Sequence, residues 1–162
     1  MMGINIGRWL AGGLVAGLVG WIIEGVAGTT YTRDVQSALE AHNLPMDMSA
    51  SVFILSVVAS LIEGLTLVFF YAVARVRFGP GPRTAVIVAV TLWIGGNLLS
   101  LFGYQIIGLF PLRVLLMWGA IGLAKMILAA LVGGWIYRES WSSSKPPRAT
   151  AGRHGPEFAA ST

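Results

Sequence analysis

Three ionisable residues, Glu24, Glu63 and Lys125, lie inside long apolar stretches of this 162-residue chain. A charge at the centre of a membrane helix costs about 2.5–3.5 kcal/mol, so such side chains are expected to face other protein groups or a hydrated cavity. An intramembrane carboxylate can exchange protons or bind a ligand, whereas a neighbouring lysine can instead neutralise it in a structural ion pair. Both interpretations stay open at the level of the sequence.

Depth within the membrane predicts which of these charges meet. Glu63 and Lys125 each lie about 20 Å from the outer end of their apolar stretch, so we expect them to pair near the midplane. Asn97 reaches a similar depth and is predicted to complete an intramembrane polar cluster. Glu24 lies only about 6 Å below its outer end, where the long side chain of Arg113 is its predicted partner.

Four apolar runs must position these side chains. At about 1.5 Å per residue each run exceeds the ~30 Å hydrocarbon thickness of a bilayer, and none carries a polar stripe for water. Backbone groups in lipid must bond within their own segment, which favours helices. We therefore predict an all-α, four-helix transmembrane bundle over residues 1–138, with these spans: 4–28, 50–74, 84–109 and 112–137.

The distribution of basic residues predicts the orientation of the bundle. The side that holds both termini carries Arg8, Arg75, Arg77, Arg83, Arg138, Lys145, Arg148 and Arg153, whereas the other side carries Arg33 and Arg113. Basic residues stay cytoplasmic, so both termini are predicted inside. Residues 139–162 lack apolar periodicity and are predicted to form a disordered basic cytoplasmic tail.

Two segments near the amino terminus allow further expectations. Arg8, the first apolar run and the small residues 26–28 also fit a cleavable signal peptide, although Glu24 and the glycines of this run favour a retained helix. On the outer side, residues 32–43 predict a short interfacial helix with Val35 and Leu39 on one face, ended by Pro45.

Small residues recur at helical spacing along three of the runs. They let helix backbones approach closely in a membrane, and so predict the packing surfaces of the bundle. This predicted helix-packing seam consists of Gly13, Gly17, Gly20, Ser56, Ser60, Gly64, Gly122 and Gly133. On the third run, Trp93, Asn97, Ser100 and Tyr104 form a polar and aromatic stripe.

Several function classes find no support in the residues. The chain has no cysteine, its two histidines lie in a connection and in the tail, and no phosphate loop or nucleophile elbow occurs. We therefore predict no enzymatic activity, no metal and no cofactor. The net charge of +4 comes from residues between apolar runs, which indicates topology and lipid contact rather than nucleic-acid binding.

Asn5-Ile6-Gly7-Arg8, the run from Gly12 to Gly17 and residues 77–85 resemble a group of small uncharacterised bacterial four-helix integral membrane proteins. The resemblance covers most of residues 4–138. It implies a bacterial inner membrane and one retained bundle, and it carries no activity.

Two functional hypotheses follow. The first is a non-enzymatic accessory or assembly subunit that acts through helix packing, in a homo-oligomer or a larger membrane complex. The alternative is an oligomeric small transporter or channel that uses the cluster of Glu63, Lys125 and Asn97.

Overall fold

A computed structural model describes residues 4–46 and 49–138 of the chain. The described elements are α1 (Ile6–Gly28), α2 (Thr32–Ala41), α3 (Ala50–Phe78), α4 (Pro82–Leu92), the π-helical segment η1 (Trp93–Leu98), α5 (Leu99–Ile106) and α6 (Leu112–Arg138). The tail predicted over residues 139–162, with Lys145, Arg148 and Arg153, lies outside the described residues.

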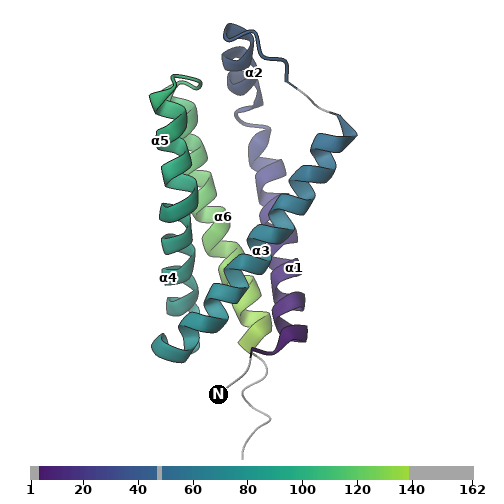
Figure 1. Cartoon of the computed structure of the whole chain (residues 1–162), viewed down its shortest axis with the longest axis vertical. Coiled ribbons are helices and arrows are strands. Elements are labelled where there is room, and N and C mark those ends of the chain that lie inside the picture. Colours follow the sequence, from purple (N-terminus) through teal and green to yellow (C-terminus); the bar gives the residue numbers. More distant parts are fainter. Residues whose placement is uncertain (1–3, 47–48, 139–162) are drawn as a thin grey trace, which may run out of the picture.

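Four helices are long and apolar enough to cross a bilayer: α1, α3, the continuous unit α4–η1–α5, and α6. The predicted all-α bundle of four spans is therefore confirmed, and the chain is a multi-pass membrane protein. Helix α1 begins and α6 ends at one end of the bundle, while α2 lies at the opposite end (Figure 1). We call these the terminal end and the α2 end.

Short polar and glycine signals set the helix boundaries. The side chain of Asn5 accepts a hydrogen bond from the Arg8 backbone and caps α1. Helix α3 continues past the predicted residue 74 to Phe78, because Arg75 and Arg77 fit in its last turn with their charges beyond the apolar region. It ends at Gly79, whose φ of 81° is costly for other residues.

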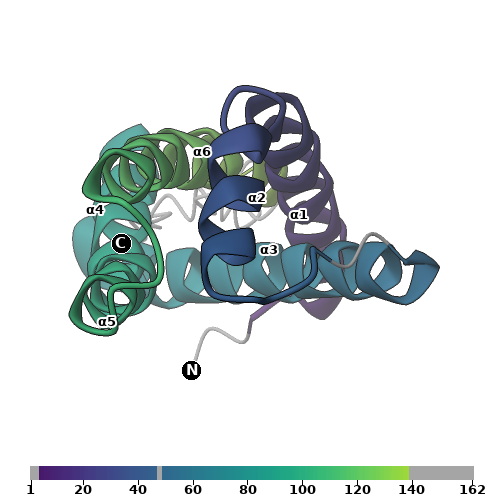
Figure 2. The same cartoon turned by 90° about the horizontal axis from the view of Figure 1, so that it is seen from above.

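Helix α2 is docked on the bundle. It ends at Ala41, two residues before the predicted end, and the φ of 57° at Asn43 then lets the Leu44 N–H donate to the Leu39 carbonyl at 2.9 Å. Its predicted apolar face, Val35 and Leu39, packs against the buried cluster around Phe110. Seen from above, α2 therefore crosses the end of the bundle (Figure 2).

The half of the bundle next to the terminal end, which we call the terminal half, contains the main core. Tyr71, Leu67 and Val68 of α3 are almost fully buried there against α1, α4 and α6. The Tyr71 hydroxyl accepts from the Gly81 backbone N–H at 3.2 Å, which ties the connection between α3 and α4 to this core. The terminal half is thus closed by direct packing of all four spans.

Candidate functional site

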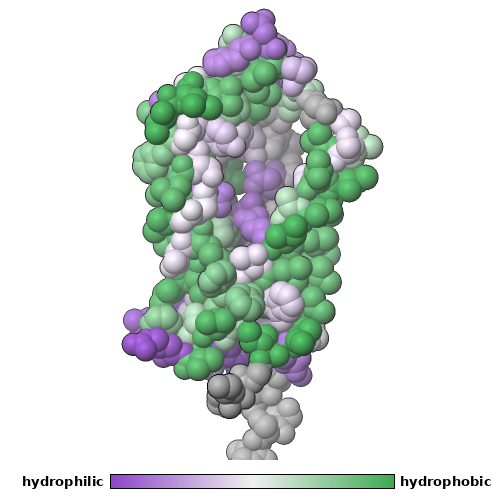
Figure 3. Space-filling view, viewed as in Figure 1, coloured by the Kyte–Doolittle hydropathy of each residue, from purple (hydrophilic) through white to green (hydrophobic). Residues whose placement is uncertain are grey.

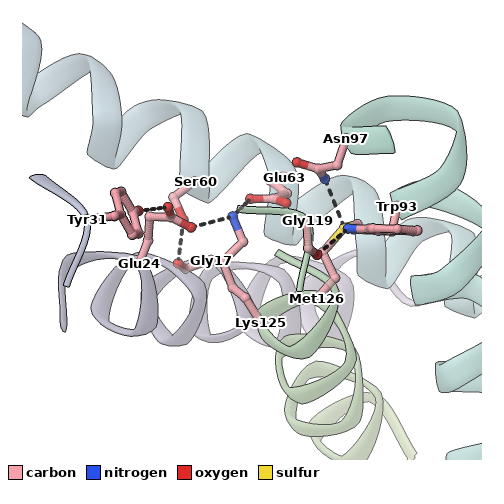
Figure 4. Close-up of polar contacts among 10 residues, drawn as sticks. All are labelled: Gly17, Glu24, Tyr31, Ser60, Glu63, Trp93, Asn97, Gly119, Lys125 and Met126. Atoms are coloured by element: carbon pink, nitrogen blue, oxygen red, sulfur yellow. Dashed lines mark hydrogen bonds and ion pairs between the residues drawn. The ribbon is translucent and has the colours of Figure 1, made fainter. Parts of the chain in front are cut away.

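One lysine lies between two carboxylates inside the bundle (Figure 4). The Nζ atom of Lys125 on α6 lies 3.1 Å from Oε2 of Glu63 on α3 and 3.4 Å from Oε2 of Glu24 on α1. The predicted pairing of Glu63 with Lys125 is confirmed by this geometry. The second carboxylate was not expected at this position, and the three residues together form what we call the ion cluster.

The predicted pair of Glu24 with Arg113 is wrong. Glu24 lies one turn before the end of α1, whereas Lys125 lies more than three turns after the start of α6. Their contact shows that α1 ends deeper in the bundle than α6 begins, so the helix ends at the α2 end are not level. Arg113 instead lines a pocket at the α2 end together with Asp34 and His42.

Tyr31, just beyond α1, extends the ion cluster toward the α2 end. Its hydroxyl donates to Oε1 of Glu24 at 2.7 Å. Burial, followed by the hydrogen bond to the Glu24 carboxylate, raises the pKa of Tyr31 well above that of an exposed tyrosine. Tyr31 was not part of the site predicted from the sequence. Its spacing of seven residues from Glu24, two helical turns, was the available signal.

The predicted helix-packing seam brings α1 against α3 at the level of the cluster. A side chain at Gly17 would overlap Leu61 and the Ser60 carbonyl, each at 2.7 Å. The Ser60 hydroxyl donates across this contact to the Gly17 carbonyl at 2.8 Å. Gly20 lies beside the aliphatic part of Lys125, and its missing side chain leaves room for the lysine to pass α1.

The remaining seam residues take different neighbours. Gly64 of α3 lies directly on the Gly13 and Gly17 backbone, and Gly133 of α6 faces Gly12, a close contact that the sequence interpretation had missed. Ser56 accepts from the Trp21 indole at 3.2 Å. Gly122 faces Trp93 of the third span rather than α1 or α3.

The third span contains a π-helical turn at the level of the cluster. Within it, the Trp93 indole donates to the Gly119 carbonyl at 3.1 Å, and the Asn97 amide donates to Sδ of Met126 at 3.3 Å. Asn97 therefore bonds α6 rather than the ion cluster. Such wide turns often occur at functional sites, and Gly95-Gly96 was the only sequence sign of this one.

Two cavities adjoin the ion cluster, and Glu24 and Lys125 line both. One, of 380 Å³, is also lined by Asn97, Ser100, Leu101, Tyr104, Trp118 and Gly122. The other, of 300 Å³, is also lined by Glu63 and by residues of α1 and α3. The space-filling view shows a hollow in the half of the bundle next to the α2 end, which we call the α2 half, with hydrophilic residues at the base of the hollow (Figure 3).

The two carboxylates are more exposed than the lysine. The side chain of Glu24 is 44% exposed and that of Glu63 is 31% exposed, against 12% for Lys125. A structural ion pair inside a membrane is expected to be enclosed, because exposure to lipid costs free energy. The ion cluster therefore presents acceptor oxygens to space that can hold water or a ligand.

The charges of the ion cluster do not balance. With all three residues ionised, two negative charges face one positive charge, which leaves one carboxylate charge without a partner. Among the described residues no group of three or more metal-ligating side chains occurs. The arrangement can therefore accept one proton or one monovalent cation.

Comparisons with protein-family models, with curated proteins and with solved structures find no match to this chain.

Proposed function

We propose that this is a non-enzymatic membrane protein that binds one positive charge, a proton or a small cation, at the ion cluster of Glu24, Glu63 and Lys125. Such a site suits a small proton-linked transporter. The observation that carries the proposal is the geometry of two partly exposed carboxylates on one lysine. An uncompensated charge at this depth is costly, so uptake of a proton or cation is favoured.

The orientation that we propose places the cavities toward the outside. Arg8, Arg75, Arg77 and Arg83 lie at the terminal end of the described bundle, which the positive-inside rule assigns to the cytoplasm. The hollow then lies in the outer half of the membrane, and Tyr31 connects the ion cluster to the α2 end. The core of the terminal half closes the path toward the cytoplasm in this conformation.

Infrared titration of the purified protein in detergent tests the proposal. The carboxyl C=O band should show one group that takes up a proton as pH falls and releases it when a cation is added. Glu63→Gln and Glu24→Gln should each abolish this uptake, because one carboxylate then balances Lys125. Glu40→Gln is the matched control, since this exposed glutamate of α2 bonds Gln36 and lies outside the cavities.

Flux measurements extend the same test. In liposomes the wild-type protein should dissipate a proton gradient faster than the Glu63→Gln variant, while Glu40→Gln should match the wild type. Equal infrared spectra of wild type and Glu63→Gln would contradict the binding proposal. A proton-binding signal without flux would restrict the role to binding.

A second candidate, an accessory or assembly subunit that acts through helix packing, is favoured by one observation. Helices α3 and α5 flank the hollow and carry strongly exposed apolar side chains: Leu55, Ile62, Leu99, Phe102 and Ile106. A second copy or a partner helix could cover them. The mass of the complex in mild detergent tests this role, which predicts that Lys125→Met changes association rather than proton uptake.

A further inference from the structure

We infer that the cation bound at this site is an organic ammonium ion with an apolar body, held between the Glu24 carboxylate and the aromatic wall of the larger cavity. This inference rests on the proposed function and names its ligand class. It draws on the composition of the 380 Å³ cavity, which combines Glu24 with Tyr104, Trp118 and Asn97.

The aromatic wall is built around Trp118. Its ring makes edge-to-face contacts with Phe110, Tyr31 and Tyr104, at centroid distances of 4.8, 5.8 and 6.2 Å. These neighbours fix the orientation of the Trp118 ring. Aromatic faces attract ammonium groups, and tryptophan does so most strongly, particularly where water is excluded.

Size and charge together favour an organic cation. A cavity of 380 Å³ falls in the range of small-molecule sites, about 300–1,000 Å³. A hard metal ion such as Ca²⁺ or Mg²⁺ binds several oxygen ligands, and aromatic faces do not provide them. An anion would meet the carboxylates of both cavities, while Lys125 is already engaged by Glu24 and Glu63.

The route to the site suits a molecule with an apolar part. The hollow opens on the face of the bundle between α3 and α5, where a bilayer would surround it (Figure 3). An ammonium head could then reach Glu24 while its apolar body stays among apolar side chains. A free organic amine and an aminophospholipid headgroup share this chemistry, so the test must separate the two sources.

Within residues 4–46 and 49–138, few titratable groups face Glu24. Lys125 of α6, Glu63 of α3 beyond it, Tyr31 after α1 and Tyr104 of α5 surround the carboxylate. Of these side chains, the two carboxylates carry the negative charge. Because the proposed site takes up one positive charge, ligand and proton compete for it, and affinity should fall as pH is lowered.

Equilibrium dialysis with benzyltrimethylammonium on the full chain in dodecyl maltoside, a detergent without an ammonium group, tests the inference. We expect saturable binding that weakens with acid, at least tenfold weaker binding in Glu24→Gln and Trp118→Leu, and no saturable binding of benzyl alcohol. Trp135→Leu, at an exposed tryptophan outside the larger cavity, should bind as the wild type. Tyr104→Leu provides a second cavity variant if Trp118→Leu fails to fold.

Native mass spectrometry with phosphatidylethanolamine or phosphatidylglycerol separates the two sources. Retention of phosphatidylethanolamine alone, lost in Glu24→Gln, would support the ammonium site and assign it to a lipid. Binding of benzyltrimethylammonium without lipid retention would support it and assign a free amine.

Failure of the ligand class can be told apart from failure of the proposed function. If neither ammonium compound binds while the infrared titration still shows one exchangeable proton, the ligand inference is overturned and the proton site stands. If the cavity variants bind benzyltrimethylammonium as tightly as wild type, the inference is also overturned. Absence of both the proton signal and ligand binding would overturn both proposals.

Discussion

The two halves of this bundle differ in how their helices meet. In the terminal half, glycines bring backbones into direct contact, as where Gly64 lies on Gly13 and Gly17, and buried side chains such as Tyr71 fill the rest. In the α2 half, the helices separate around two cavities, and the ion cluster lies at their base. The packed core of the terminal half is available to offset the free-energy cost of the charges in the α2 half.

The largest loss of stability should come from adding a side chain where helix backbones touch in the terminal half. Gly64→Leu would place a side chain on the Gly13 and Gly17 backbone, which cannot move aside as a side chain could. We expect a loss of about 4 kcal/mol or more in the free energy of unfolding, or no folded protein at all. Thermal unfolding in detergent measures this, and Gly103→Leu, with no neighbour within 4 Å of its added Cβ, should retain near-wild-type stability.

Removing the positive charge of Lys125, which Glu24 and Glu63 share, should cost less stability. Lys125→Met leaves Glu24 and Glu63 without their positive partner, and we expect about 3 kcal/mol, a low value for a buried pair because both carboxylates are partly exposed. Adding Glu24→Gln and Glu63→Gln should restore most of the stability. If the triple variant unfolds as readily as Lys125→Met, lost packing rather than uncompensated charge is the cause.

A smaller effect with a defined pH dependence is expected at Tyr31. Tyr31→Phe removes the hydrogen bond to Glu24 and should lower stability by about 1.5 kcal/mol near neutral pH. Burial and this hydrogen bond raise the pKa of Tyr31, so folding favours its protonated form. The contribution is therefore complete below pH about 10, the value for an exposed tyrosine, and falls as pH rises above it.

Unfolding midpoints of wild type and Tyr31→Phe should consequently converge in alkali, where the wild type loses its advantage. Tyr104→Phe should keep the alkaline loss of the wild type, because Tyr31 remains. A constant difference between wild type and Tyr31→Phe up to strongly alkaline pH would contradict this assignment.

The smallest effect should come from losing a single hydrogen bond between α3 and α1. Ser60→Ala removes the bond from α3 to the Gly17 carbonyl and should cost about 0.6–1 kcal/mol. Ser100→Ala is the matched control, since Ser100 bonds only the Gly96 carbonyl of its own span in the described structure. Equal unfolding midpoints for the two variants would show that this interhelical bond adds nothing.

The sequence alone determined the number and approximate limits of the spans, because a bilayer requires about 20 apolar residues whatever the helices do next. It also predicted that Glu63 meets Lys125, since a lysine and a glutamate at equal depth have few alternatives in lipid. The glycines at helical spacing on α1 predicted a close backbone contact, and the structure shows that α3 is the partner.

Only the tertiary structure decided how the helix ends are staggered, and this determined the partner of Glu24. The sequence prediction treated the outer ends as level and chose Arg113, whereas packing places the end of α1 deeper and brings Glu24 to Lys125. The π-helical turn that directs Asn97 to Met126 likewise depends on contacts with α6. Vertical offsets and helix distortions result from many distant contacts, and no local pattern in the chain encodes them.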